Sequence, residues 1–415
     1  MNCRFCKAPL THVFIDLNNS PASNSFLTKE QLNGPETFYP LKVFICDKCF
    51  LVQVDEYKTS DAIFSSDYVY FSSFSTSWLA HAKEYTQKMT DRFGLNANSK
   101  VIEIASNDGY LLQYFKEQNI PVLGIEPTPN TAESAVKKGI ETVVDFFGVR
   151  LAKELAAKNI KADLLLGNNV LAHVPDIVDF VGGMKILLKE DGVITMEFPH
   201  LMQLVDNNQF DTIYHEHFSY LSFHTVKQIF ESQDFKMFDV EEIPTHGGSL
   251  RIYASHKENS QQQLSENVNT LLQKEYSKGM NALDYYNNFQ QKALKVKLDL
   301  TDFLIKQKRE NLPTGQAGKK VAAYGAAAKG NTLLNYCGIK NDLIDFVVDA
   351  NPHKQNKFLP ASHIPVMNED ELKKNKPDFV IILPWNLKTE ITAQLNYIKD
   401  WGGKFVVAIP ELEIF

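Results

Sequence analysis

Short apolar runs that alternate with helical segments constrain the fold of this 415-residue chain more than any other feature. The alternation occupies residues 98 to about 255 and resumes at residue 319. Strands separated by helices of about 10–15 residues are typical of a parallel, doubly wound sheet. The sequence therefore predicts an α/β protein with a central α/β unit and a smaller one near the C-terminus. Residues 59–97 are predicted to lead into the first unit as helix, and the polar, helical residues 256–317 to connect the two.

Four of the five cysteines form two CxxC pairs, Cys3 with Cys6 and Cys46 with Cys49. Two thiolates on one CxxC turn reach a single ion, and two such turns complete the tetrahedral shell of four sulfurs that Zn²⁺ accepts. A site with four protein ligands and no open position is structural rather than catalytic. A redox dithiol, or unrelated buried thiols, is the alternative. We predict that zinc holds the turn-rich residues 1–58 folded.

Composition narrows the classes of function. The net charge of −7 does not favour nucleic-acid binding through a basic face. No apolar run approaches the ~20 residues needed to cross a bilayer, and the start of the chain lacks the apolar core of a secretory signal. Paired thiols in a chain of this length fit metal binding in a reducing compartment better than a disulfide framework. The sequence therefore predicts a cytoplasmic protein.

The segment VIEIASNDGYLL, residues 101–112, ends one predicted strand and opens a helix. It carries acidic side chains in place of the GxGxxG loop that binds a pyrophosphate. The next predicted strand ends at Glu126, whose carboxylate can accept hydrogen bonds from ribose hydroxyls. An acidic turn at the strand ends suits a cationic adenosyl cofactor, so we predict S-adenosylmethionine; a merely solvated acidic loop is the alternative. The predicted cofactor residues are Glu103, Ser106, Asn107, Asp108, Gly109, Glu126, Asp145 and Phe146 (edge and face of the adenine), and Asn168 and Asn169.

The segment FDTIYHEHFSYLSF, residues 210–223, places two histidines and a glutamate in an apolar, aromatic stretch. In an extended strand, His215 and His217 would point to one face and Tyr214 and Glu216 to the other. A metal site would need a third ligand such as His173 or His246, and a structural polar network is a further alternative. We favour general acid–base chemistry, because imidazole titrates near pH ~6.5.

Two later motifs contain basic side chains that could bind phosphate groups. THGGSLR, residues 245–251, places a flexible turn before Arg251, whose guanidinium is a fork for a phosphate. YGAAAKG, residues 324–330, approximates a dinucleotide-binding turn with Asp349 on the next strand, but it departs from GxGxxG. Lys329 in this motif can face a diphosphate near a helix start, or be an ordinary solvated lysine. Cys337 is predicted to be a small core residue.

Motifs along nearly the whole chain, in order, resemble the sugar C-methyltransferase family. They are CRFC…CDKC, YVYFSSFS, VIEIASNDGYLLQYF, GNNVLAHVPD, EFPH, FDTIYHEHFSYLS, THGGSLRIY, YGAAAKGNTLLNY and LPWNLKTEI. The family acts on nucleotide-linked 4-keto-deoxysugars, commonly at C-3. The resemblance implies an N-terminal zinc-binding module (1–58), a central Rossmann-like class I methyltransferase domain that uses S-adenosylmethionine (59–255), and a C-terminal Rossmann-like domain that helps to hold the nucleotide sugar (318–415).

Carried over by position, His217 looks like the base that removes the proton beside the keto group. The other residues implied for the substrate pocket are Tyr68, His173, Tyr214 and Glu216, to which the motifs above add His246, Arg251 and Lys329. The implied substrate is a dTDP-4-keto-6-deoxyhexose. The sequence leaves the oligomeric state open, and a monomer is compatible with it.

The chain departs from the family pattern at Ala327 and at Ala361 and Asn18, in turns where proline and glycine, respectively, are usual. These departures concern sugar or nucleotide preference. A sugar O-methyltransferase, a nicotinamide-dependent sugar oxidoreductase and a zinc-stabilised nucleotide-sugar binding module remain alternatives.

Overall fold

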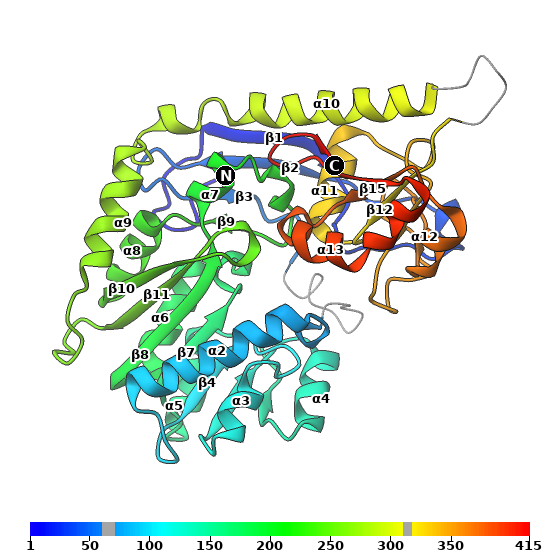
Figure 1. The fold of residues 1–415 in the computed structure, drawn as a ribbon. Coiled ribbons are helices and arrows are strands. Elements are labelled where there is room, and N and C mark those ends of the chain that lie inside the picture. Colours follow the sequence, from blue (N-terminus) through cyan, green and yellow to red (C-terminus); the bar gives the residue numbers. More distant parts are fainter. Residues whose placement is uncertain (60–70, 310–317) are drawn as a thin grey trace. The chain divides into compact units, whose positions relative to one another are not determined.

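The computed structural model describes residues 1–59, 71–309 and 318–415 (Figure 1). The chain forms two compact units, each assembled from three separate segments. Unit 1 contains Met1–His12, Ile45–Leu201 and His217–Leu283, and unit 2 contains Val13–Phe44, Met202–Glu216 and Asp284–Phe415. The domain boundaries at residues 58, 255 and 317 stay predictions.

Unit 1 is built on a seven-stranded sheet of order β10-β11-β8-β7-β4-β5-β6. The strands β8, β7, β4, β5 and β6 run parallel, which confirms the predicted doubly wound arrangement, while β11 and β10 add an antiparallel edge. The strands are β4 (Val101–Ile104), β5 (Val122–Ile125), β6 (Thr142–Val143), β7 (Ala162–Asn168), β8 (Leu188–Pro199), β10 (Phe235–Ile243) and β11 (Ser249–His256). The helices are α2 (Thr76–Phe93), α3 (Leu112–Glu117), α4 (Pro129–Lys137), α5 (Val149–Ala157), α6 (Ile177–Leu187), α8 (Phe223–Glu231) and α9 (Glu266–Ser277).

Helix α2 shows why these residues form these elements. The Ser75 side chain caps its first turn by accepting a hydrogen bond from the Trp78 backbone N–H at 3.2 Å, and Gly94 ends it in the left-handed conformation. Its buried residues recur every three or four positions, so that one stripe faces the apolar core of unit 1. The helix thereby carries Trp78 and its neighbours to the sheet.

Unit 2 contains a smaller sheet of order β14-β13-β12-β15-β16-β17, parallel except for β17. Its strands are β12 (Val321–Tyr324), β13 (Phe346–Val348), β14 (Val366–Met367), β15 (Phe379–Ile382), β16 (Lys404–Val407) and β17 (Glu413–Ile414), and its helices are α10 (Phe289–Arg309), α11 (Ala328–Cys337), α12 (Asp370–Asn375) and α13 (Lys388–Gln394). The predicted second α/β unit is therefore present. The strands β1 (His12–Ser20) and β2 (Tyr39–Ile45), distant in sequence, also belong largely to unit 2.

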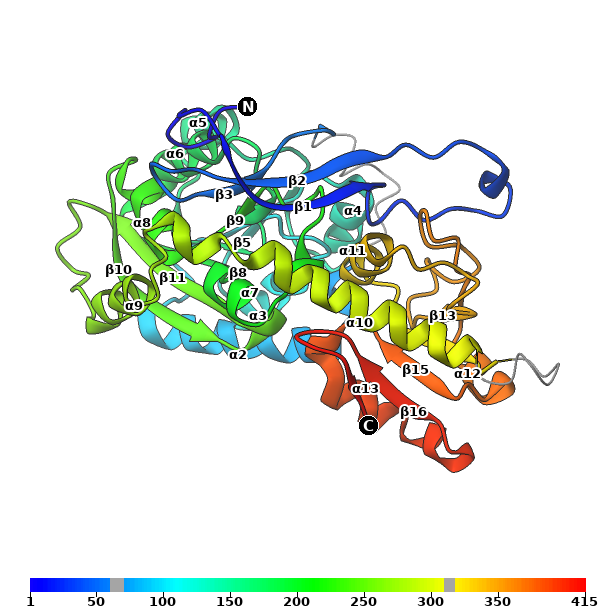
Figure 2. The same cartoon turned by 90° about the horizontal axis from the view of Figure 1, so that it is seen from above.

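The long helix α10 is more than a solvated connector. It runs beside α11, as Figure 2 shows, and one of its faces is buried. At its start, Phe289 stacks on Phe14 of β1 with ring centroids 4.6 Å apart. The polar composition of residues 256–317 suggested connecting helices that face solvent, but α10 buries apolar side chains along one face.

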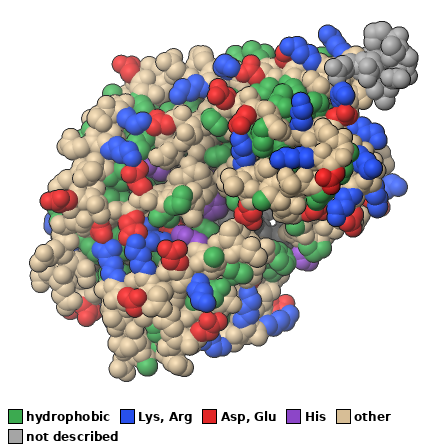
Figure 3. All heavy atoms as spheres, viewed as in Figure 1, with side chains coloured by type: hydrophobic (Ala, Val, Ile, Leu, Met, Phe, Trp, Pro, Cys, Tyr) green, Lys and Arg blue, Asp and Glu red, His purple; other side chains and the backbone are tan. Residues whose placement is uncertain are grey.

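On the face seen in Figure 3, acidic and basic side chains are interspersed. Exposed ion pairs of the described residues include Lys274 with Glu242 and Lys388 with Glu413. Exposed pairs contribute little stability, about 0–1 kcal/mol each. In the part of the chain that the structure describes, no helix is both long and apolar enough for a membrane span.

Candidate active site and metal centre

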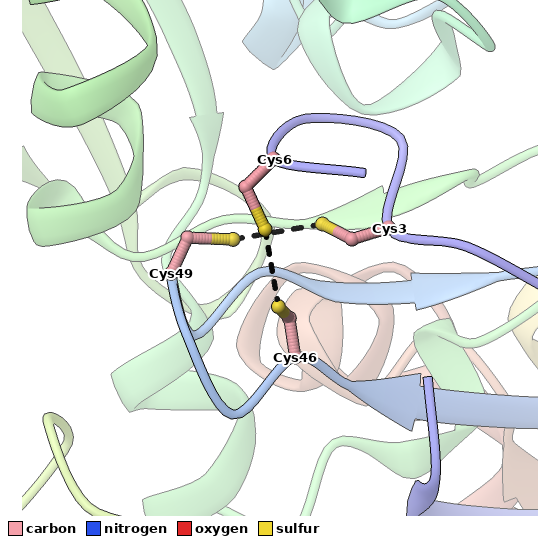
Figure 4. A group of neighbouring side chains, drawn as sticks. All are labelled: Cys3, Cys6, Cys46 and Cys49. Atoms are coloured by element: carbon pink, nitrogen blue, oxygen red, sulfur yellow. Dashed lines mark hydrogen bonds between the residues drawn. The ribbon is translucent and has the colours of Figure 1, made fainter. Parts of the chain in front are cut away.

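The four cysteines of the two CxxC pairs point their sulfurs toward a common centre (Figure 4). All four Sγ atoms lie within 4.8 Å of one another; Cys3 and Cys49 are 3.5 Å apart and Cys6 and Cys46 are 3.4 Å apart. A tetrahedral zinc site with Zn–S distances of about 2.3 Å has sulfurs about 3.8 Å apart. The four thiols therefore fit Zn²⁺, and the predicted structural zinc ligands are brought together.

The two CxxC turns share one backbone geometry. The Lys7 N–H donates to the Cys3 carbonyl at 3.0 Å, and the Phe50 N–H donates to the Cys46 carbonyl at 3.0 Å. Lys7 and Phe50 each adopt the left-handed conformation, with φ of 62° and 57°. Each turn thus directs its two thiols toward a common centre, with a residue other than glycine at the left-handed position. The CxxC spacing alone did not reveal this feature.

The cysteines differ in how readily they form thiolates: burial raises the pKa of Cys6 to about 11, and the hydrogen bond with Cys3 together with burial raises that of Cys49, whereas Cys3 is favoured as a thiolate. A hydrogen bond with the Cys49 thiol lowers the pKa of Cys3 to about 4 even though burial opposes the charge. The Gln53 side-chain N–H donates to the Cys3 sulfur at 3.2 Å. Such second-layer donors orient a metal ligand and moderate its charge.

The carboxyl ends of β4 and β7, together with the turn after β4, contain several buried polar side-chain atoms for which the described residues provide no hydrogen-bond partner. They include both carboxylate oxygens of Glu103, which is 0% exposed, the Ser106 hydroxyl, and the side-chain oxygen and nitrogen of Asn168 at the end of β7. Burial, together with the nearby Glu126 and Asp108 carboxylates, raises the pKa of Glu103 well above its ordinary value. Unsatisfied polar atoms at the carboxyl ends of adjacent parallel strands fit a polar, cationic ligand such as S-adenosylmethionine.

Glu126 ties two turns of this pocket together. Its carboxylate accepts the Asn107 backbone N–H at 2.9 Å through one oxygen and the Thr128 backbone N–H at 2.9 Å through the other. Burial raises the pKa of Glu126 despite these bonds. The contact of this carboxylate with a ribose hydroxyl stays a prediction.

The cofactor turn needs glycine at residue 109. Gly109 has a φ of +75°, and a Cβ there would lie 2.4 Å from the Ile140 side chain. Beside it, the Lys138 ammonium donates to the Asp108 carbonyl at 2.8 Å and to its carboxylate at 3.1 Å, and to the Ser73 hydroxyl at 2.8 Å. Asn107 accepts the Ser72 backbone N–H at 2.9 Å, so residues 72–73 are fixed to the turn.

The residues predicted for the adenine lie after β6, at the far edge of the same sheet. Asp145 accepts two hydrogen bonds from Arg150, each 2.7 Å long, and one from the Phe146 backbone N–H at 2.8 Å. Both Asp145 and Phe146 remain partly exposed. The contact with adenine therefore stays a prediction.

Two predicted site histidines meet in unit 1. His173 lies in the short 3₁₀ helix η3 (Leu171–His173), which follows β7, and the centroid of its ring is 4.6 Å from that of His217 with the planes at 75°. Tyr220 lies on β9 (Ser219–Tyr220), and the centroid of its ring is 6.2 Å from that of the His217 ring. The imidazoles of His173 and His217 thus form an edge-to-face pair near the end of the strand that also carries Asn168.

His246 occupies a second position at this rim. Its Nε2 is 3.0 Å from the Asn169 amide nitrogen, and its ring lies 5.1 Å from Trp78. His246 has a φ of 54°, a left-handed conformation that costs of order 1 kcal/mol. His246 is therefore held close to Asn169, and the roles of both residues in a pocket stay predictions.

The YHEH segment is a turn, not a strand. His215 is buried with its Nε2 3.2 Å from the Pro40 carbonyl oxygen and its ring against Tyr39 in unit 2. The Glu216 carboxylate accepts both hydrogen-bond contacts of the Asn24 amide, at 2.8 and 3.0 Å, also in unit 2. The expectation that His215 and His217 share one face of a strand is corrected, because the turn sends them to different neighbours.

The remaining members of this predicted pocket are placed as follows. Tyr214 is partly exposed, and Tyr68 lies outside the described residues. Among the described residues, the four cysteines are the one group of histidine, cysteine and acidic side chains arranged to hold a metal ion. The histidine-based metal site considered above gains no support from this geometry.

A buried charge network at the same rim was missed by the sequence analysis. The His81 Nε2 on α2 is 2.8 Å from one oxygen of Glu197 on β8, and the His81 ring stacks on Trp78 at 4.9 Å. Glu197 lies directly beside Asn168 in the β7–β8 register. Burial raises the pKa of Glu197, but His81 and Arg251 more than offset it, so the net shift is downward. No local motif links residues 81 and 197, which are 116 positions apart.

Arg251 belongs to this network. Its guanidinium donates to Glu197 at 2.7 Å through two nitrogens and to Glu241 at 3.2 Å, and it is buried on β11. Because the guanidinium N–H groups of Arg251 already donate to two carboxylates, this arrangement argues against the predicted phosphate contact. We assign Arg251 to the support of Glu197 instead.

In unit 2, Lys329 at the start of α11 is half-buried beside two polar side chains. Its ammonium donates to the Asn386 side-chain oxygen at 2.8 Å and lies 4.8 Å from the centre of the Trp385 ring. Burial lowers the pKa of Lys329, and the nearby Asp211 carboxylate partly offsets this. Asp211, 0% exposed, accepts the Trp385 indole N–H at 2.8 Å. Lys329 is therefore not an ordinary solvated lysine.

Asp349 stabilises the predicted dinucleotide-like turn by accepting two backbone hydrogen bonds. Asp349 accepts the Ala326 backbone N–H at 2.7 Å through one oxygen and the Asn351 backbone N–H at 2.8 Å through the other. Gly325 has a φ of +88°, and a Cβ there would lie 2.6 Å from Pro384. An aspartate that holds its own turn is less available for the ribose of a nicotinamide cofactor, so the geometry gives that alternative no support. Cys337 is buried, as predicted.

Comparison with known proteins tests these interpretations. Three protein-family models match successive parts of the chain: a zinc binding domain at residues 3–64, a methyltransferase domain at 78–240 and a C-methyltransferase C-terminal domain at 244–410. The C-methyltransferase NovU of Streptomyces niveus is 32% identical over 409 residues, which are 99% of this chain and 95% of NovU. The family resemblance is thereby confirmed.

Solved structures add only distant likenesses. The PH0226 protein of Pyrococcus horikoshii matches with a TM-score of 0.38 and 14% identity, over 46% of this chain and 95% of that protein. An S-adenosylmethionine-dependent methyltransferase of Archaeoglobus fulgidus matches with a TM-score of 0.33 and 14% identity, over 42% and 93%. Neither likeness carries an argument here. The zinc module and the methyltransferase domain follow from the family models, the cysteine cluster and the sheet order. The chain belongs to the family of S-adenosylmethionine-dependent, zinc-containing C-methyltransferases.

Proposed function

We propose that this enzyme methylates the ring carbon beside the ketone of a nucleotide-linked 4-keto-6-deoxysugar, at C-3 of a dTDP-linked hexose, in deoxysugar biosynthesis. The observation that carries the proposal is the pairing of His217 with His173, whose ring centroids are 4.6 Å apart at the rim where the cofactor residues gather. Both lie in motifs that resemble the sugar C-methyltransferases. We further propose a monomer that works in the cytoplasm.

The chemistry explains why imidazoles are needed there. A hydrogen on carbon resists removal unless it flanks a carbonyl, because only then does its loss give an enolate. In this proposal His217 takes that proton, and the paired electrons move onto the keto oxygen. A donor beside that oxygen stabilises the developing charge, a contribution typically worth about 10²–10³ in rate. His173 or Tyr214 is proposed for this role, with Glu216 and Tyr68 lining the pocket.

The bound cofactor supplies a methyl group on a positively charged sulfur. In this proposal the residues of the chain would hold it: Glu126 would accept the ribose hydroxyls, and Glu103, Ser106 and Asn168 would contribute buried polar atoms. A turn lined with carboxyl groups favours a cationic ligand over a neutral one, because the bound cation in turn favours their charged form. Lys329 is proposed to contact the diphosphate of the nucleotide sugar.

A deuterium experiment tests the proposal. A dTDP-4-keto-6-deoxyhexose labelled with deuterium at C-3 is incubated with enzyme and cofactor, and the product is analysed by NMR for the methyl position and for loss of the label. His217→Gln should lower the rate about 10²–10⁴-fold, the usual contribution of a general base. His215→Gln is the matched control, because the His215 imidazole faces the Pro40 carbonyl instead. Its rate should stay within a few-fold of the wild type.

Three results would contradict the proposal. One is a new methyl group on oxygen, and another is a C-methylated product that retains all of its C-3 deuterium. The third is near-wild-type turnover by His217→Gln. Release of a reduced nicotinamide by the enzyme would instead favour the oxidoreductase alternative.

A further inference from the structure

Arg4, between the first two zinc-ligand cysteines, makes contacts that a zinc-binding turn does not require. One guanidinium nitrogen donates to the Pro175 carbonyl at 2.7 Å, and another donates to the Val54 carbonyl at 2.5 Å. The guanidinium also lies 5.3 Å from the centre of the Phe218 ring. The Arg4 backbone N–H donates to the Gln53 side chain at 2.8 Å, and Gln53 in turn donates to the sulfur of Cys3.

These contacts all fall on segments that carry the histidine pair. Pro175 follows His173 by two residues. Phe218 follows His217 directly, and the Phe218 carbonyl accepts the Val54 backbone N–H at 3.1 Å. The antiparallel pairing of Val52 with Tyr220 continues this connection between β3 (Val52–Val54) and β9.

We infer that Arg4 is a positioning residue through which the zinc centre fixes the geometry of His173 and His217. A guanidinium is suited to this, because its rigid planar fork holds two carbonyl oxygens from different segments at once. Its face also packs on the Phe218 ring, a contact worth about 0.5–2 kcal/mol. The zinc module thereby acts on the reaction at a distance, without contacting substrate.

The arrangement is not the one that stability alone would favour. The Arg4 Nε is buried, and the described residues offer it no hydrogen-bond partner. A buried donor without a partner costs about 1–3 kcal/mol. The turn has all its metal ligands without Arg4. A buried Arg4 with this cost is therefore better explained by a role beyond stabilising the turn.

The inference rests on the roles proposed above for His173 and His217, so its test has two independent readouts. The variants are Arg4→Met, which keeps an apolar stem, and Arg4→Lys, which keeps the charge but loses the fork. Lys48→Met is the matched control, since Lys48 is an exposed lysine of the second CxxC turn whose ammonium pairs with neighbouring Asp47. Zinc content and the affinity for S-adenosylhomocysteine are measured for each variant to establish that the metal and cofactor sites persist.

The first readout needs no sugar substrate. In protein labelled with ¹³C-histidine, the ring signals of His173 and His217 are assigned with His→Gln variants, and the cross-relaxation between the two rings is measured. Arg4→Met should shift both signals and weaken their cross-relaxation, whereas Lys48→Met should leave them unchanged. The second readout is deuterium loss from the labelled 4-ketosugar, which should slow about 10–100-fold in Arg4→Met, the cost of misplacing a catalytic group by about 1 Å. Arg4→Lys should fall between Arg4→Met and the wild type in both.

The two readouts separate the possible failures. If the wild-type enzyme releases no deuterium, the proposed function is wrong, yet the histidine signals still report whether Arg4 positions the pair. Unchanged histidine signals in Arg4→Met would overturn the inference. Loss of zinc, or an equal disturbance of all histidine signals, in both Arg4→Met and Arg4→Lys would also overturn it, because Arg4 would then only hold the fold together.

Discussion

Asp211→Asn should make the protein more stable and the enzyme worse. Asp211 is completely buried, and burial raises the pKa of its carboxyl from an ordinary value near 3.8 to about 6. The folded state therefore holds the proton more tightly than the unfolded state does. Stability from this group is present below about pH 4 and is lost as the pH rises to about 6, since the unfolded chain releases the proton first.

The magnitude follows from the shift. A difference of about two pH units corresponds to up to about 3 kcal/mol of unfolding free energy above pH 6. Asn removes the buried charge and keeps an oxygen for the Trp385 indole N–H. Part of the gain is offset, because Lys329 loses a nearby opposite charge. At about 2–4 °C per kcal/mol for a domain of this size, the unfolding midpoint at pH 8 should rise by several degrees.

Function should move the other way. Without the Asp211 carboxylate, burial lowers the pKa of Lys329 unopposed and the ammonium loses a nearby partner, so the proposed diphosphate contact should weaken. The KM for the nucleotide sugar should rise while the affinity for S-adenosylhomocysteine stays unchanged. Thermal unfolding from pH 4 to 8 is compared for wild type, Asp211→Asn and the control Asp302→Asn, whose carboxylate is exposed and pairs with Lys306. A midpoint for Asp211→Asn that is lower at pH 8, or a gain that is equal at pH 4, would refute the reasoning.

Three further predictions concern other parts of the molecule. Metal analysis of the wild type should return about one zinc per chain, and Cys46→Ser should return none; iron or copper in its place would contradict a structural zinc site. Glu126→Gln should weaken S-adenosylhomocysteine binding about 10–100-fold in calorimetry, because a charged acceptor for the ribose is lost; an unchanged affinity would remove Glu126 from the pocket. Glu275→Gln should lower the free energy of unfolding by about 2–4 kcal/mol in urea titrations, since the buried Glu275 carboxylate accepts the Phe223 and His224 N–H groups and pairs with His200 at 2.7 Å; a loss below about 1 kcal/mol would argue against that network.

Local pattern was sufficient for much of the fold. The buried parallel strands read as apolar runs because both of their faces are covered, as in β7, and the turns between them carry their own polar and glycine residues. Which segments of the chain assemble into each unit could not be predicted from local pattern. Residues 13–44 pack with segments more than 150 positions away, and no periodicity in a sequence specifies such a partner.

In the candidate site, too, some residues could be predicted from local sequence, and others depend on contacts between distant parts of the chain. The cysteine cluster was predictable because the ligand spacing is itself the geometric requirement for zinc, and Glu126 because it ends a strand. Sequence alone left open whether YHEH is extended or turned; in the structure the Ile213 carbonyl accepts a hydrogen bond from the Thr332 hydroxyl at 2.9 Å, and the chain turns after it. The hydrogen bond between His81 and Glu197 joins a helix to a strand with no shared motif, so it became visible only in three dimensions.

The zinc centre also closes a loop. Cys6 and Cys46 are 40 positions apart, and cross-linking a chain over that length removes about 4 kcal/mol of conformational freedom from its unfolded state. The loop between them contains Val13–Phe44, the first segment of unit 2, including the Asn24 amide that binds Glu216. An ion bound in one unit thus restrains a strand pair that the other unit needs, and a chelator should loosen the enclosed residues before it unfolds the rest.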